Sequence, residues 1–127
     1  MKLKGALLTI ALGATITSAA TAQDDGSEVI LPLEAQTCSL PAAPARIPDE
    51  ATYDDLKKAK GNIGTFQAEL TSYRECLDSS AESGDLTDGN EIALGQAHNY
   101  SVEMEERVAE QFNEAVRSYK ERKAAEG

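Results

Sequence analysis

The sequence contains no tryptophan, a single histidine and only two cysteines among its 127 residues. Catalytic triads and most transition-metal sites are assembled from histidine, cysteine and acidic side chains, and this chain has few of the first two. It also has no Cys-x-x-Cys pair, no glycine-rich phosphate loop and no Gly-x-Ser-x-Gly motif. We therefore expect a non-catalytic protein without a metal ion or other cofactor.

Basic side chains are scarce as well, with 12 Lys and Arg against 22 Asp and Glu and a formal net charge of −10. A nucleic-acid-binding protein needs a basic surface to displace counterions from phosphates, and docking on anionic lipid needs a similar surface. The composition therefore predicts no nucleic-acid partner and no docking on anionic membranes. The acidic stretch 78–90 lacks the alternating acids before a glycine that define an EF-hand calcium loop.

Residues 1–22 have the pattern of a secretory signal peptide. Lys2 and Lys4 precede a mostly apolar stretch, and the small residues Ala20 and Ala22 occupy the −3 and −1 positions of a cleavage site. The apolar stretch is shorter than the roughly 20 residues of a membrane-spanning helix. We therefore expect cleavage after Ala22, a periplasmic location and no stable membrane insertion. Cleavage removes two lysines and no acid, which changes the formal net charge from −10 to −12.

A proline-rich segment follows at residues 38–51. Its three prolines are Pro41, Pro44 and Pro48. Prolines at this spacing exclude a helix and favour an extended, polyproline-like path, so we expect an extended arm. Residues 23–37, which precede it, begin with acidic and polar side chains, and we expect a flexible acidic segment there.

The two cysteines, Cys38 and Cys76, stand at either end of this arm and the helix predicted after it. In an oxidising compartment the default is one disulfide between them. The arm from Cys38 to Thr52 spans about 43 Å at polyproline rise, and a helix from Thr52 to Cys76 is about 36 Å long. The arm can therefore run back along the helix and reach Cys76, which favours a structural bond over a redox-active one.

A long helix is predicted to begin after Thr52 and to reach about Leu77. Its apolar side chains alternate in steps of three and four, which is the stripe of helices packed side by side: Leu56, Ala59, Ile63, Phe66, Leu70, Tyr73 and Leu77. Thr52 can cap the start, with Asp55 three residues later. Gly61 and Gly64 each weaken a helix by about 1 kcal/mol, so a break near Gly61 remains an alternative.

Residues 78–90 read as a connecting loop, and a second helix is predicted from near Asp88, which has capping-box spacing with Glu91, to about Lys123. Residues 124–127 are expected to fray. The apolar face of this helix comprises Leu94, Ala97, Val108, Phe112, Ala115 and Tyr119.

Together these elements predict an all-α protein, an antiparallel helical hairpin with an extended arm fastened by one disulfide. Matching the ends next to the loop places Leu77 beside Leu94 and Phe66 beside Glu105, to within about one helical turn. The expected organisation is a signal peptide (1–22), a flexible segment (23–37), a proline-rich arm (38–51), the hairpin (52–123) and a frayed tail (124–127).

Three polar residues stand out on the second helix. His98 has no metal partner one turn away, because Gly95 occupies the position where a carboxylate-bridged metal bundle has its acid. We expect a partly buried histidine that is hydrogen-bonded to Tyr73 across the hairpin. Glu105 falls near the centre of the apolar arc, where an unpaired carboxylate is costly. It must reach an edge or be satisfied by Ser101 or by a partner chain, and it is a candidate for fixing helix register.

Several short segments together resemble a group of short, exported, uncharacterised α-helical bacterial proteins. They are Cys38, Ile47-Pro48-Asp49, Tyr73, Cys76-Leu77-Asp78, His98-Asn99 and the final Phe112-Asn113 to Tyr119-Lys120 stretch. The resemblance covers about residues 38 to 120. It implies the helical fold and export, and it carries no activity and no site residue.

These features predict an exported protein that acts without catalysis, by helix-mediated self-association or by interaction with another envelope protein. The regular apolar stripes on two long helices, in a chain with little else to bury, motivate this prediction. A chaperone-like or peptide-binding module is the alternative, in which the same apolar surface shields hydrophobic peptides.

Overall fold

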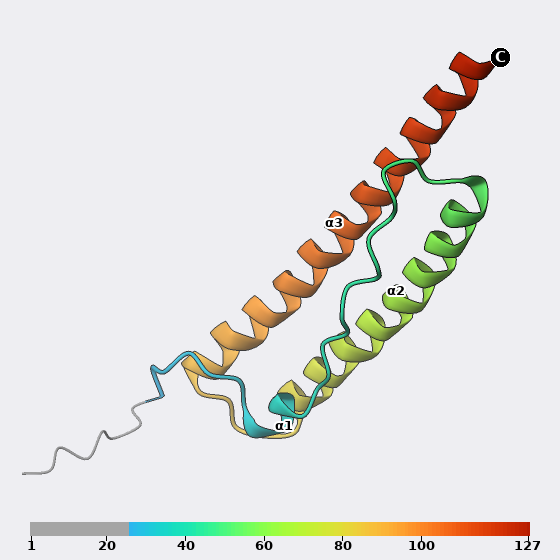
Figure 1. Cartoon of the computed structure of the whole chain (residues 1–127). Helices are drawn as coiled ribbons and strands as arrows, with labels where there is room; N and C mark the ends of the chain where they lie inside the picture. Colours follow the sequence, from blue (N-terminus) through green and yellow to red (C-terminus); the bar gives the residue numbers. More distant parts are fainter. Residues whose placement is uncertain (1–25) are drawn as a thin grey trace, which may run out of the picture.

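The computed structural model of the chain describes residues 26–127, so the predicted signal peptide lies outside the described residues. The described residues form helices α1 (Leu33–Gln36), α2 (Tyr53–Glu82) and α3 (Asp88–Glu126), and they contain no strand. Figure 1 shows α2 and α3 lying side by side and antiparallel, joined by a short loop. The prediction of an all-helical protein with a helical hairpin is confirmed.

Helix α2 begins with a complete capping box. The backbone N–H of Asp55 donates to Thr52 Oγ1 at 3.1 Å, and the backbone N–H of Thr52 donates to Asp55 Oδ2 at 2.9 Å. The helix continues without a break through Gly61 and Gly64, both of which are exposed. The alternative of a break near Gly61 is therefore wrong, because the apolar stripe holds the helix against α3 across both glycines.

Helix α2 ends at Glu82 rather than near Leu77, so residues 78–82 are helical and the predicted loop is too long. Ser80 explains the difference. Its hydroxyl donates back to the Cys76 carbonyl at 2.8 Å, and its side chain is buried next to Cys38. Tertiary packing of this buried side chain therefore supports the helix where composition alone predicts a loop, because helices in proteins are stabilised mainly by such packing.

Helix α3 is capped by Thr87 rather than by Asp88. The Asn90 backbone N–H donates to Thr87 Oγ1 at 3.0 Å, and Asn90 Oδ1 accepts from the Thr87 backbone N–H at 3.1 Å. The amide of Asn90 thus takes the role predicted for the carboxylate of Glu91. The helix continues to Glu126, past the predicted end near Lys123, and fraying of residues 124–127 stays a prediction.

The core between the helices consists of two small clusters. Near the loop, Tyr73 and Leu77 pack with Leu94 of α3, and farther along Phe66 packs with Val108. Leu77 therefore meets Leu94 as predicted. Phe66 lies one turn beyond the predicted position beside Glu105, so the predicted register is correct to about one helical turn.

The segment before the disulfide contacts the hairpin. Helix α1 inserts Ala35, which is 1% exposed, against Tyr73 and Leu77 of α2. The Asn90 side chain donates to the Ile30 carbonyl at 2.8 Å. The described residues 26–37 therefore contact the hairpin through Ala35 and the Ile30 carbonyl, and the flexibility of segment 23–37 stays a prediction.

Cys38 and Cys76 form the predicted disulfide, with their Cα atoms 5.7 Å apart. From Cys38 the proline-rich segment (38–51) contains no helix or strand, and Figure 1 shows it running back along α2 and α3 to the start of α2. Its far end is held by Arg122, which donates to the carbonyls of Asp49 at 3.2 Å and Ala51 at 2.6 Å.

Candidate functional site

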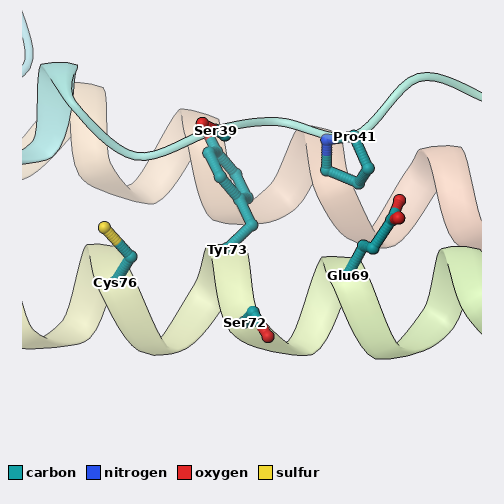
Figure 2. A pocket seen from close by; sticks show the side chains of 6 residues that line it. All are labelled: Ser39, Pro41, Glu69, Ser72, Tyr73 and Cys76. Carbon is teal, nitrogen blue, oxygen red and sulfur yellow. The ribbon is translucent and has the colours of Figure 1, made fainter.

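A hollow of about 390 Å³ lies beside the disulfide, between the proline-rich segment and α2. Its lining residues are Ser39 and Pro41 from the segment and Glu69, Ser72, Tyr73 and Cys76 from α2. Figure 2 shows Tyr73 reaching from α2 up to Ser39, which divides the disulfide end from the side lined by Glu69 and Pro41. The hollow exists because the disulfide holds the segment against the helix at one end.

The chemistry of this hollow is simple. It offers the carboxylate of Glu69, the hydroxyls of two serines and an apolar wall made of Pro41 and Tyr73. Cys76 is in the disulfide and is therefore no free nucleophile. A site of this composition can hold an extended or amphipathic ligand, but its lining includes no nucleophile with an adjacent base.

A second polar feature lies within the helix pair, where Arg74 of α2 meets Ser101 and Glu105 of α3. Arg74 Nε donates to Ser101 Oγ at 2.9 Å, and Arg74 Nη1 lies 3.5 Å from Glu105 Oε1. Ser101 is fully buried, and its hydroxyl donates in turn to the His98 carbonyl at 2.6 Å. The cluster therefore joins both helices and the backbone of α3.

The charges in this cluster are half-shielded from water. The side chains of Arg74 and Glu105 are 19% and 30% exposed, and Arg74 Nη2 is buried without a hydrogen-bond partner. An arginine presents its donors in a fixed fork, so these contacts define how α2 and α3 lie along each other at this level. The cluster is thus an internal polar contact between the helices rather than an open binding site.

The sequence identified Ser101 and Glu105 but not Arg74. We expected the carboxylate of Glu105 to reach an edge, Ser101 or a partner chain, and the structure pairs it with an arginine of the same chain. Arg74 follows Tyr73 directly, so it lies next to the apolar stripe rather than in it. The sequence signal for Arg74 is a basic residue that flanks the apolar stripe of α2 at the level of Glu105.

His98 lies outside this cluster. Its side chain is exposed, whereas Tyr73 is buried against Ala35 and Leu77. The predicted hydrogen bond between His98 and Tyr73 is therefore wrong. The physical reason is the register of α3, which places Ala97 rather than His98 against the cluster that contains Tyr73.

Within residues 26–127, His, Cys, Asp and Glu side chains nowhere gather in groups of three or more that could hold a metal ion. None of the helices in this part of the chain is both long and apolar enough to cross a bilayer. No protein-family model, no curated protein and no solved structure matches the chain.

Proposed function

We propose that this is an exported, non-catalytic protein that acts through its hairpin by association, either with a second copy or with another envelope protein. In this proposal the proline-rich segment is an extended arm that the disulfide fastens across one side of α2 and α3. The disulfide supports export to an oxidising compartment such as the periplasm, because such bonds are rare in reducing ones.

One observation carries the proposal, a row of partly exposed apolar side chains along α3. The row comprises Val102, Ala109 and Val116. The proline-rich segment lies on the other side of the helix, where Gln111 and Ser118 line hollows together with Pro44 and Ile47. The described segments before α2 therefore leave this row uncovered.

An uncovered apolar row is a reason for association. A two-helix hairpin has a small core, because small domains bury a low fraction of their surface. Each Å² of apolar surface removed from water contributes about 25 cal/mol. A partner helix that packs along the row therefore stabilises the complex relative to the single chain. Half-buried positions at helical spacing are the usual contacts of packed helices.

Chemical cross-linking in the intact cell envelope tests the proposal, combined with mass spectrometry of the linked products. We expect products that contain peptides of α3, and we expect Val116→Ser to reduce their yield. Leu40→Ser, which changes an exposed apolar residue of the proline-rich segment, is the matched control. A chain that stays unlinked in the envelope, and monomeric at every concentration in solution, would exclude association.

A chaperone-like or peptide-binding module is the second candidate. Exposed apolar side chains in the first described segment favour it, since Val29, Ile30 and Leu33 are 49%, 47% and 78% exposed. Replacing all three with serine should abolish the suppression of aggregation of an unfolding client protein. If the unaltered chain fails to suppress aggregation at equimolar concentration, this candidate is excluded.

A further inference from the structure

We infer that the uncovered side of the hairpin is self-complementary and docks a second copy of this chain with its helices antiparallel to the first. This inference rests on the proposed function and names the partner. The surface, called the open face below, has three parts. They are a central part (Val102 and Ala109, with the exposed Glu106 between them), a basic end (Lys60 and Lys120) and an acidic end (Asp78 and Glu91).

On α2, helical phase places the charged residues of the open face away from the proline-rich segment. Lys60 and Asp78 are each nine residues from Glu69, which lines the hollow beneath that segment. Nine residues make about two and a half turns, or a rotation of about 180°. Lys60 and Asp78 therefore share the side of α2 opposite Glu69, and both are exposed.

The same argument holds on α3. Val102 and Lys120 are each nine residues from Gln111, and Ala109 is nine residues from Ser118. Gln111 and Ser118 lie against the proline-rich segment. Eighteen residues make about five whole turns, so Glu91 has the same phase as Ala109.

The charges of the open face are separated by sign along its length. Because α2 and α3 are antiparallel and Phe66 packs on Val108, Lys60 and Lys120 lie towards the same end of the hairpin. Asp78 and Glu91 lie towards the other end, next to the loop. Among the described residues these four groups form no ion pair, since the salt bridges there are Arg46–Asp49, Arg74–Glu105 and Lys123–Glu126.

A single two-fold axis brings opposite charges together at both ends of the open face. On α3, the midpoint between Glu91 and Lys120 falls between residues 105 and 106, and so does the midpoint between Val102 and Ala109. On α2, the midpoint between Lys60 and Asp78 is residue 69, beside Leu70, which shares a cluster with Met104 of α3. All three midpoints thus lie at one level of the hairpin.

Rotation by about 180° around an axis at this level, across the helices, lays each helix on its own copy in the opposite direction. Lys60 then faces the second copy's Asp78, and Lys120 faces the second copy's Glu91. Val102 meets the second copy's Ala109 at the centre, where the small alanine permits the helix separation of about 8–10 Å that packing requires.

The charge pattern also selects this occupant over others. A lipid surface or a nucleic acid presents one sign of charge, which the open face attracts at one end and repels at the other. A second copy supplies the opposite sign at both ends because the reversed orientation exchanges them. Val102 and Ala109 of the central part then add apolar contact on either side of the axis.

Sedimentation of the full mature chain at about 0.15 M salt tests the inference through charge reversal. Lys60→Glu and Asp78→Lys each place like charges together at both symmetric contacts, and each should weaken the dimer by about tenfold. Lys58→Glu on α2 and Glu103→Lys on α3 are the matched controls. They change the net charge equally at exposed positions outside the open face, and they should leave the dimer unchanged.

A mixture of the two charge variants makes the test specific. The acid introduced at position 60 of one copy faces the lysine introduced at position 78 of the other, and a native Lys60–Asp78 pair forms at the second contact. We therefore expect a mixed dimer as tight as the original, and the same recovery when one chain carries both changes. Circular dichroism on each variant verifies that the helices remain.

The possible outcomes separate this inference from the proposed function. If the chain dimerises and the charge variants change nothing, the open face is wrong, while association stands. If the chain is monomeric but cross-links to another envelope protein, the two-fold dimer is overturned and the proposed function is retained. If neither association occurs, both are overturned.

Discussion

At the scale of single residues, the most informative feature is the contact of Arg74 with Ser101 and Glu105. A half-buried arginine needs acceptors, and the structure provides a buried hydroxyl at 2.9 Å and a carboxylate at 3.5 Å. One further nitrogen of Arg74 is already without a partner. The cluster therefore has no spare acceptor, and the loss of one is costly.

Ser101→Ala tests this directly. The change leaves Arg74 Nε without its acceptor, and we expect the free energy of unfolding to fall by about 1–2 kcal/mol and Tm by roughly 5–10 °C. Ser72→Ala, at an exposed serine of α2, should cost much less. Thermal unfolding followed by circular dichroism, at one fixed protein concentration, measures both, and equal losses would contradict a role for the Arg74 contact.

Asp55 gives a prediction for pH dependence. The pKa of Asp55 lies below its ordinary value of 3.8. The main cause is the hydrogen bond from the backbone N–H of Thr52, and the second is the hydrogen bond with the Thr52 side chain. A lowered pKa in the folded chain stabilises the fold at pH above 3.8, and this stabilisation is lost as the pH falls through the folded value.

The measurement compares the unaltered chain with Asp55→Asn. The unaltered chain should be the more stable at neutral pH, and the difference should shrink as the pH falls through 3.8 and below, because the carboxylate becomes protonated. Asp54→Asn, in the same first turn but outside the capping box, serves as the control. A difference that is constant over this range would contradict the assigned cause.

At the scale of elements, the glycines divide by environment. A Cβ on Gly61 would meet nothing within 4 Å, whereas a Cβ on Gly89 would overlap the Glu28 carbonyl. Gly61 is therefore replaceable, and Gly89 is required because the first described segment crosses α3 closely there. Because both residues are glycine, the sequence alone does not distinguish the two positions.

Gly61→Ala should stabilise the protein by about 1 kcal/mol, because alanine is the better helix former and no contact is disturbed. Gly89→Ala should destabilise the protein, because the segment around Glu28 must move away from α3. This movement breaks the hydrogen bond from the Gly89 N–H to the Gly26 carbonyl. Chemical denaturation measures both. A gain at Gly89 would show that the crossing segment is easily displaced.

At the scale of the whole molecule, two contacts between residues far apart in the sequence hold the proline-rich segment in place. The disulfide fixes its start across a sequence separation of 38 residues, and Arg122 holds its end through two backbone carbonyls. The hairpin and this segment therefore depend on each other, although the segment has no secondary structure of its own.

Replacing Cys38 and Cys76 together with serine should lower the free energy of unfolding by about 4 kcal/mol, the chain-entropy value for a loop of this length. It should also speed tryptic cleavage after Arg46, whose side chain is 85% exposed within the segment. Far-UV circular dichroism reports whether α2 and α3 remain. Unchanged cleavage would mean that Arg122 alone holds the segment.

The features that depend on local spacing could be predicted from the amino-acid sequence alone. Apolar side chains spaced three or four residues apart predicted both long helices. The pair Thr52 and Asp55 predicted the cap of the first one. The two cysteines predicted the disulfide, since the lengths of arm and helix match. These features depend on neighbours within a few residues or on one covalent bond, so the printed sequence is sufficient for them.

The features that depend on which surfaces meet follow from the packing of the two helices. This packing directs Ala97 rather than His98 to the cluster of Tyr73, sets Arg74 beside Glu105 and buries Ala35 of α1. A small change in which side of α3 faces α2 alters little within either helix but alters the contacts between them. The partner of each side chain is therefore set by the packing of the whole hairpin.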